Sequence, residues 1–455
     1  MKTVSRTELF ERTPIARAIV TLAVPTIMSS LVMVLYNLAD TFFVGMLNDP
    51  IQNAAVALAA PILLAFNAVN NLFGVGSSSM MSRAMGRKDF DTVRKSSAFG
   101  FYCAVGGGLL ISLICGVFEV PILTLMGAEE STYEATAGYV LWTVIFGAAP
   151  SILNVVMAYM VRAEGNALHA SIGTMSGCFL NNILDPIFIL PWGLNMGAAG
   201  AGLATMISNC AACAYFFVLL FIRRKDTNIS FSPRHFTLKK EIVLGVFGVG
   251  LPASIQNLLN VTGMTILNNF TAAFGADAIA AMGITQKIYM VPMNVSSGIS
   301  QGVMPLVGYN YASGNTQRMK KTVTLSAKII LAFMVIVTLF FYVFAGGLVE
   351  LFMSNPSIIG YGTRFMRGFC LGLPFLSMDF LAVGVFQAVG MGKYSLCFAI
   401  LRKVVLEIPA LYILNFLFPL YGLAYAQFAA EIVLAAAAVI ILARIFRQME
   451  KTKRF

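Results

Sequence analysis

The chain has 455 residues, of which 58% are hydrophobic and only 11% are charged. Soluble domains carry roughly a quarter charged residues, because polar side chains must cover a surface exposed to water. This composition therefore excludes a soluble globular protein and indicates a membrane protein with many spans. The net charge of +11 is spread over short loops and tails rather than over one face, which argues against a nucleic-acid partner.

Apolar runs long enough to cross a bilayer, about 20 residues each, follow one another in two groups of six. The first group is 15–46, 53–82, 94–118, 134–162, 168–191 and 197–222, and the second is 241–274, 277–311, 320–346, 358–390, 395–417 and 420–446. The sequence thus predicts an all-α integral membrane protein with twelve transmembrane helices in two pseudo-symmetric six-helix bundles. We expect an N-terminal lobe over 1–222, a cytoplasmic linker over 223–240 and a C-terminal lobe over 241–455.

The basic residues lie on one side of this predicted arrangement. Both termini and the loops after every second span contain Lys or Arg, whereas the opposite loops contain none (47–53, 119–133, 192–196, 275–276, 347–357 and 418–419). By the positive-inside rule, both termini are expected on the cytoplasmic side of the cell membrane. The first span carries no Ala-x-Ala-like cleavage site, so we expect no removed signal peptide.

The two halves of the chain resemble each other. LAVPTIMSSL, which contains Pro25, recurs as GVGLPASIQNL, which contains Pro252, and three further matches follow in the same order, at spacings of 220 to 228 residues. Pro150 and Pro374 also lie inside predicted spans, where a missing backbone hydrogen bond bends a helix. A duplicated membrane fold favours transport by alternating access, and the absence of a GxxxxGK[ST] loop favours an ion gradient over ATP as the energy source.

Ionisable residues inside spans are the strongest functional signal in this sequence. An ionised carboxylate at membrane depth costs at least about 2.5–3.5 kcal/mol, so each one needs a partner or a role. Asp40 and Asp185 lie in N-lobe helices that contain no Lys or Arg near them. The C-lobe spans, in contrast, hold both signs of charge, and we expect mutual neutralisation there among Lys287, Arg402, Lys403, Asp379, Glu407 and Glu431.

The missing counter-charge in the N-lobe is expected to be the coupling ion. A proton could bind to either carboxylate, because two neighbouring carboxylates repel each other when both are charged. Sodium would need several oxygen ligands, which Asn181 and Thr205 could add to Asp40 and Asp185. The sequence does not choose between the two ions. It also leaves open a purely structural alternative, in which Asp40 lies in the outer interface and caps its helix.

The remaining chemistry-bearing residues predict neither an enzyme nor a bound cofactor. We find no DDxxD or HExxH motif and expect no G-x-S-x-G serine, and the cysteines lie in apolar runs without metal-ligand spacing. The two histidines, His169 and His235, fall near a span end and in the linker. We therefore expect no resident metal beyond a possible sodium ion.

Four features of the sequence together carry a resemblance: YNLADTFFVG around Asp40, RAMGRKD, NNILDPIFIL around Asp185, and the RAxG/QAxG pair at 162 and 387. Through them, the chain resembles the multidrug and toxic compound extrusion (MATE) family over essentially its whole length. The resemblance implies two six-helix bundles and export of organic cations and other amphipathic compounds in exchange for protons or sodium. Carried over residue by residue, it places the cation site on Asp40, Asn181, Asp185 and Thr205.

The family's NorM-type branch has a further C-lobe site, made by a Glu and an Asp. Asp379 matches the Asp, but Asn260 stands where the Glu would be. This departure favours the branch that resembles the DNA-damage-inducible protein F type.

A cavity for amphipathic small molecules is expected between the lobes, and we expect the protein to act as a monomer in the bilayer. The 25 Met and 36 Phe residues suit an adaptable apolar lining, although most of them are expected to face lipid or to pack. A flippase for a lipid-linked sugar precursor, which would need a strongly basic cavity, is the alternative function. The candidate cavity residues are Tyr36, Asn37, Gln256, Asn257, Tyr289, Met293 and Asp379.

Overall fold

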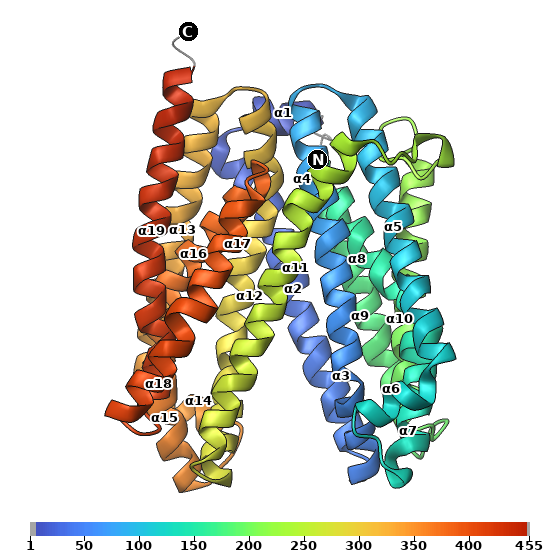
Figure 1. Ribbon diagram of the computed structural model, residues 1–455, viewed down its shortest axis with the longest axis vertical. Helices are drawn as coiled ribbons and strands as arrows, with labels where there is room; N and C mark the ends of the chain where they lie inside the picture. The colour runs from blue at the N-terminus through green and yellow to red at the C-terminus, as the bar shows by residue number, and fades with distance from the viewer. Residues whose placement is uncertain (1–5, 453–455) are drawn as a thin grey trace. The chain divides into compact units, whose positions relative to one another are not determined.

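The computed structural model describes residues 6–452, and most of that range is helical (Figure 1). Its long helical segments coincide with the twelve predicted spans to within a few residues. In the first half they are α2 (Ile15–Gly45), α3–η1–α4 (Pro50–Asn70, Asn71–Val75, Gly76–Gly86), α5 (Phe90–Val117), α7–η2–α8 (Glu130–Val140, Leu141–Ile145, Ala148–Ala163), α9 (Ala167–Ile189) and α10 (Ala198–Ile222). In the second half they are α11 (Lys240–Ala272), α12 (Ala276–Ala312), α13 (Thr316–Val343), α15–α16 (Pro356–Cys370, Leu373–Ala388), α17–η4–α18 (Gly392–Ile400, Leu401–Glu407, Ile408–Leu417) and α19 (Gly422–Thr452).

Short helices fill the connections between these segments. They are α1 (Arg6–Glu11), α6 (Glu119–Leu125), the 3₁₀ turn η3 (Pro233–His235) and α14 (Ala345–Glu350). The connection before the long helix α5 caps that helix, since the Asp89 side chain accepts a hydrogen bond from the Thr92 backbone N–H at 3.1 Å. Hydrogen bonds from Thr92 lower the pKa of this carboxyl, so the cap stays charged at neutral pH.

Length and apolarity alone mark nine of the segments as membrane spans. Within the described residues, seven helices pass such a test, and two bent pairs pass it together. The other three segments, α9, α12 and α17–η4–α18, are interrupted or contain the polar residues that lower their hydropathy. Those polar residues include ionisable residues discussed above, namely Asp185 in α9, Lys287 in α12, and Arg402, Lys403 and Glu407 in η4.

The four prolines predicted to lie inside spans occupy two different positions in their helices. Pro25 and Pro252 lie inside the continuous helices α2 and α11. Pro150 and Pro374, in contrast, lie in the first turns of α8 and α16. These two helices follow bends of 43° and 47° in the fourth span of each half. A proline is tolerated in a first turn because its missing N–H has no helical partner there.

The described chain packs as two compact units. Unit 1 combines the chain up to Ile27 with the chain from Ile255 onward, and unit 2 is Met28–Ser254. The chain passes from one unit to the other only within α2 and α11, two residues after Pro25 and Pro252. The sequence repeat predicts a boundary between the two lobes at the linker. The packing instead assigns the first part of α2 to unit 1 and the first part of α11 to unit 2.

The linker between the two halves is held firmly on unit 2. The Glu164 carboxylate, which is 1% exposed, accepts hydrogen bonds from Thr227 Oγ1 at 2.8 Å and from the Asn228 backbone N–H at 2.7 Å. Beyond this point, the Phe231 ring stacks on Phe101, with centroids 4.3 Å apart, and its carbonyl accepts from the Tyr102 hydroxyl. The linker is therefore an ordered part of unit 2.

We expect Glu164→Ala to release the linker. Hydrogen bonds to a charged group contribute about 1.5–3 kcal/mol each, so losing two should raise the open population at least about tenfold. Limited trypsin digestion after Arg234, Lys239 and Lys240, followed by mass spectrometry, measures this directly. Glu134→Ala, at an exposed position on α7, is the control. Cleavage at the wild-type rate in the Glu164 variant would show that these bonds do not hold the linker.

Candidate ion-coupling site

The α9 helix carries two buried polar side chains on one face. Asn181 and Asp185 are one helical turn apart, with exposed fractions of 1% and 0%. When its neighbours orient the Asn181 amide, its nitrogen donates to Asp185 Oδ2 at 2.8 Å, and its oxygen accepts from the Thr205 backbone N–H at 3.0 Å and from Thr205 Oγ1 at 3.3 Å. The structure thus brings three of the four predicted residues, from α9 and α10, into one chain of hydrogen bonds.

Asp40 approaches this chain from α2, five residues before that helix ends at Gly45. Its side chain is half-buried, and its Oδ1 atom is buried without a hydrogen-bond partner. It lies close enough to Asp185 for the two carboxylates to interact electrostatically. Within the described part of the chain, neither carboxylate has a Lys, Arg or His partner in an ion pair. Two neighbouring acidic groups therefore share a site that contains no protein cation.

Two tyrosines complete the surroundings of the carboxylates. Tyr36 lies one turn before Asp40 on α2, with its hydroxyl within reach of Thr205. Tyr139 on α7 is 4% exposed and close to both Asp40 and Asp185. From the sequence, Tyr36 was expected only as a cavity residue, and Tyr139 was not expected at the site.

A glycine explains how α10 comes close enough to α7 to form this site. A Cβ atom added to Gly202 would lie 2.8 Å from the Tyr139 carbonyl oxygen and 2.7 Å from Thr143 Oγ1. Only glycine tolerates this approach, in which small residues let two membrane helices touch. The repeated GLA at 202 and 422 was a signal for helix contact, but it did not identify the tyrosine that would be contacted.

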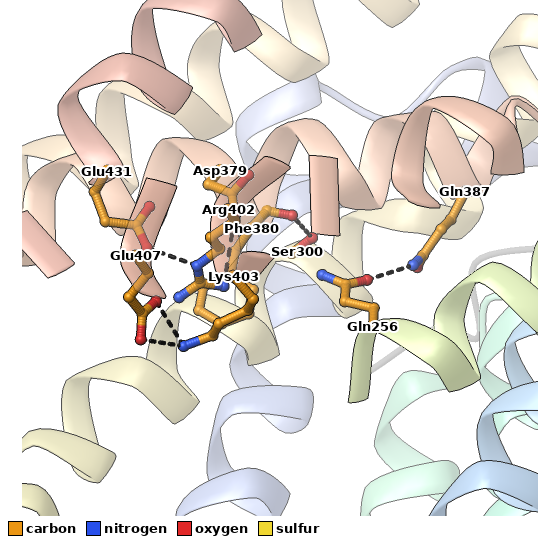
Figure 2. A network of polar contacts seen from close by, with 9 residues as sticks. All are labelled: Gln256, Ser300, Asp379, Phe380, Gln387, Arg402, Lys403, Glu407 and Glu431. Atoms are coloured by element: carbon orange, nitrogen blue, oxygen red, sulfur yellow. Dashed lines mark hydrogen bonds and ion pairs between the residues drawn. The ribbon is translucent and has the colours of Figure 1, made fainter. Parts of the chain in front are cut away.

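Unit 1 contains a second cluster of charges, in which two bases lie among three carboxylates (Figure 2). Arg402 Nε lies 2.7 Å from Glu431 Oε1 on α19, and its Nη1 lies 3.5 Å from Asp379 Oδ2 on α16. Lys403 Nζ lies 2.7 Å from both carboxylate oxygens of Glu407. All five side chains are at least nine-tenths buried. The expected pairing of opposite charges is confirmed for these five residues, with one carboxylate in excess of the two bases.

The local backbone places two adjacent bases against different carboxylates. Both lie in η4, a π-helical stretch that widens the fifth span of the second half. Arg402 reaches across to the neighbouring helices, while Lys403 pairs with Glu407 one turn along its own. The Lys403 stem lies beside Gly263 on α11, where an added Cβ would be 3.0 Å from Nζ. π-Helical turns often occur at functional positions, and this one gives each base room beside its carboxylate.

Lys287 does not join this cluster. Its side chain is exposed, and no ion pair is formed by it within the described residues. The expectation that a carboxylate of its own half neutralises it is therefore wrong. Presence in the same set of spans did not determine which way the side chain points.

The cavity candidates fall in different surroundings. Tyr289 and Asp379 belong to the buried cluster of unit 1, and the Tyr289 hydroxyl is buried without a hydrogen-bond partner. Gln256 accepts a hydrogen bond from Gln387 Nε2 at 3.4 Å. Asn257 and Met293 are half-buried in unit 1, and Asn37 is exposed in unit 2.

One enzyme-like pattern in the chain has a structural explanation. The expectation that the chain holds no G-x-S-x-G serine is wrong, because residues 298–302, GISQG, match this pattern. They lie in the middle of the α12 helix, however, rather than on a strand-to-helix turn. The Ser300 hydroxyl donates to the Phe380 carbonyl at 2.8 Å. Gly298 and Gly302 lie against the α2 backbone at Ile27 and Ala23, where an added Cβ would be within 2.9 and 2.7 Å. The pattern therefore serves helix packing.

Comparison with known proteins gives one family. The MatE family profile matches residues 25–187 and again residues 252–413, so that both matches begin at the repeated prolines and confirm the duplication. The multidrug export protein MepA of Staphylococcus aureus (strain MRSA252) is 32% identical over 434 residues, 95% of this chain and 94% of the relative. MepA of Staphylococcus haemolyticus (strain JCSC1435) is 34% identical over 437 residues, with the same coverage.

Solved structures give the same result. A multidrug resistance MATE family transporter of the MOP superfamily, in its outward-facing conformation, is 26% identical with a TM-score of 0.92, covering 99% of this chain and all of that chain. A MOP superfamily transporter from Pyrococcus furiosus matches with a TM-score of 0.90 at the same identity and coverage. The all-α, multi-pass membrane fold is thereby confirmed, and so is the expectation that the chain is a transporter rather than an enzyme. The chain belongs to the MatE family of multidrug and toxic compound extrusion transporters, which are cation-coupled.

Proposed function

We propose that the protein exports amphipathic, often cationic, drug-like compounds by alternating access, and that Asp40, Asn181, Asp185 and Thr205 form its ion-coupling site. The observation that carries this proposal is the pair of neighbouring carboxylates in unit 2 that has no protein cation. A buried pair of this kind is costly unless a mobile cation neutralises it. The substrate class is supported by the relatives, which are multidrug export proteins and match this chain over nearly their whole length.

The hydrogen bonds around Asn181 favour a proton over sodium as the coupling ion. Its amide oxygen accepts two hydrogen bonds from Thr205, so both lone pairs are already used. A sodium ion would then have mainly the two carboxylates as protein ligands, whereas hard cations prefer several oxygens. A proton needs only one carboxylate oxygen, and Asp40 Oδ1 is buried without a partner. Proton uptake and release at this pair would alternate with substrate binding.

The sequence also supports finer proposals on the branch of the family and on the orientation in the membrane. Asn260, in place of the NorM-type glutamate, supports the branch that resembles the DNA-damage-inducible protein F type. The charge distribution of the loops supports cytoplasmic termini in the cell membrane, and we propose a monomer as the working unit. The buried bases of unit 1 do not support the alternative of a lipid-linked sugar flippase, because Arg402 and Lys403 are paired with carboxylates rather than available to a pyrophosphate.

Ethidium transport by purified protein in liposomes tests this proposal. With an imposed pH gradient and no sodium, ethidium movement should exceed that of protein-free liposomes several-fold and should stop when a protonophore collapses the gradient. An imposed sodium gradient at equal pH on both sides should drive little transport. Transport driven by sodium alone would replace the proton by sodium at this site, and the absence of transport under either gradient would contradict coupled export.

A further inference from the structure

Arg162, in the last turn of α8, is a buried charge without a partner. Its side chain is 7% exposed, and its Nε atom is buried with no hydrogen-bond acceptor. Among the residues that the structure describes, no acidic side chain forms an ion pair with it. The Arg162 guanidinium lies over the Tyr159 ring, whose centroid is 5.5 Å from the guanidinium carbon. A guanidinium remains charged at any relevant pH, so this position holds an uncompensated positive charge.

The matching position in the second half is occupied differently. Gln387 follows Arg162 at the repeat spacing, and its amide donates to Gln256 Oε1 at 3.4 Å and to Ser395 Oγ at 3.3 Å. In the first half, Ser29 lies at the position that matches Gln256, and its hydroxyl accepts a hydrogen bond from Ser171 Oγ at 3.3 Å. The second half thus has at this position a neutral amide, Gln387, with hydrogen-bond partners in the protein. The first half has a cation, Arg162, whose Nε has no such partner.

The nearest acidic residue in the sequence does not neutralise Arg162. Glu164 follows two positions later, but its two carboxylate oxygens accept hydrogen bonds from Thr227 and Asn228 of the linker. The same contacts place Arg162 at the end of unit 2 that carries the linker. Membrane-protein sites at the level of the lipid headgroups often use buried basic residues to hold phosphate groups.

We propose that Arg162 binds an oxyanion of the phosphate class, either free phosphate or the headgroup of an anionic lipid, at the linker end of unit 2. The planar guanidinium fork matches two oxygens of such a group. The Tyr159 ring lies on one side of the fork, with its centroid 5.5 Å from the guanidinium carbon. The ligand supplies the acceptors and the negative charge that the protein does not provide. This site is separate from Asp40 and Asp185, so its failure would leave the coupling proposal unaffected.

Thermal unfolding of the full-length protein, followed by the fluorescence of Trp142 and Trp192, tests the site. In detergent, sodium phosphate is compared with sodium chloride at equal ionic strength and pH. In nanodiscs, phosphatidylcholine alone is compared with phosphatidylcholine containing phosphatidylglycerol. The variants are Arg162→Gln, which installs the side chain of the matching repeat position, and Arg162→Lys, which keeps the charge without the fork. Arg94→Gln, at an exposed position near the same end of unit 2, is the control.

For the wild type and Arg94→Gln, we expect a melting temperature that rises and saturates with phosphate, with phosphatidylglycerol, or with both; the arm that responds identifies the source of the oxyanion. Arg162→Gln should lose the rise, and without the oxyanion it should melt no lower than the wild type, because it removes an uncompensated buried charge. Arg162→Lys should keep a smaller rise. An equal rise in Arg162→Gln, or no saturable rise of the wild type in either arm, would overturn the proposal. Should Arg162→Gln fail to fold, the wild-type titration still decides the question.

Discussion

Replacing Asp185 with asparagine is expected to reduce gradient-driven export to the level of protein-free liposomes. Asparagine keeps the shape of the side chain, and its oxygen can still accept from the Asn181 amide that bonds Asp185 Oδ2 at 2.8 Å, so the fold should persist. It cannot take up or release a proton, and it removes half of the negative charge that would attract a cation. Ethidium transport in liposomes under the pH gradient measures the loss, and a melting temperature close to that of the wild type checks folding.

Asp40→Asn extends this test to the other half of the pair. Loss of coupling in both variants is expected, whereas normal coupling in Asp40→Asn alone would support the alternative that Asp40 only caps α2. Asp277→Asn makes the same chemical change at an exposed position on α12 and should transport like the wild type. Full coupled transport by both the Asp40 and the Asp185 variants would place the ion site elsewhere in the protein.

Replacing Arg402 with methionine should cause the largest loss of stability. The change leaves Asp379 and Glu431, which are 1% and 0% exposed, without the base that lies between them. Removing one partner from a buried ion pair costs about 3–5 kcal/mol, because an uncompensated charge remains in a medium of low polarity. Chemical unfolding in detergent, followed by tryptophan fluorescence, measures the change in the free energy of unfolding.

A matched set of variants separates lost charge balance from lost packing. Combining Arg402→Met with Asp379→Asn and Glu431→Gln removes all three charges at once and should recover most of the stability. Lys287→Met deletes a base from an exposed position without an ion pair, so its effect should stay within about 0.5 kcal/mol. If Arg402→Met cost no more than Lys287→Met, the buried cluster would contribute nothing to holding unit 1 together.

The sequence predicted the helical segments well because a bilayer imposes a minimum apolar length on each span. It also predicted that charges of both signs in the second half can neutralise one another, as Lys403 and Glu407 do one helical turn apart, but it did not predict the individual pairs. Hydropathy carries no information on side-chain direction, however, which is why Lys287 was expected in an ion pair and is exposed instead. The π-helical geometry of η4 was equally invisible, because its residues are compatible with an ordinary helix.

The coupling site could be predicted only where its residues lie close together in the sequence. Asn181 and Asp185 are one turn apart, so their common face follows from helix geometry alone. Tyr139 approaches from a helix that is distant in sequence, and its arrival depends on the close contact at Gly202. Long-range contacts of this kind require the three-dimensional packing. The lone charge of Arg162 was missed for a related reason, because a sequence cannot show that a residue lacks a partner.

The passage of the chain between units within α2 and α11 has a consequence for the ancestry of the protein. Each half of the gene encodes most of one unit together with the opening stretch of a helix that belongs to the other. A single ancestral copy would therefore have been incomplete without a second copy, with the two exchanging these stretches as in a domain-swapped dimer. The two halves of the present chain, divided at the linker, therefore do not coincide with its two compact units.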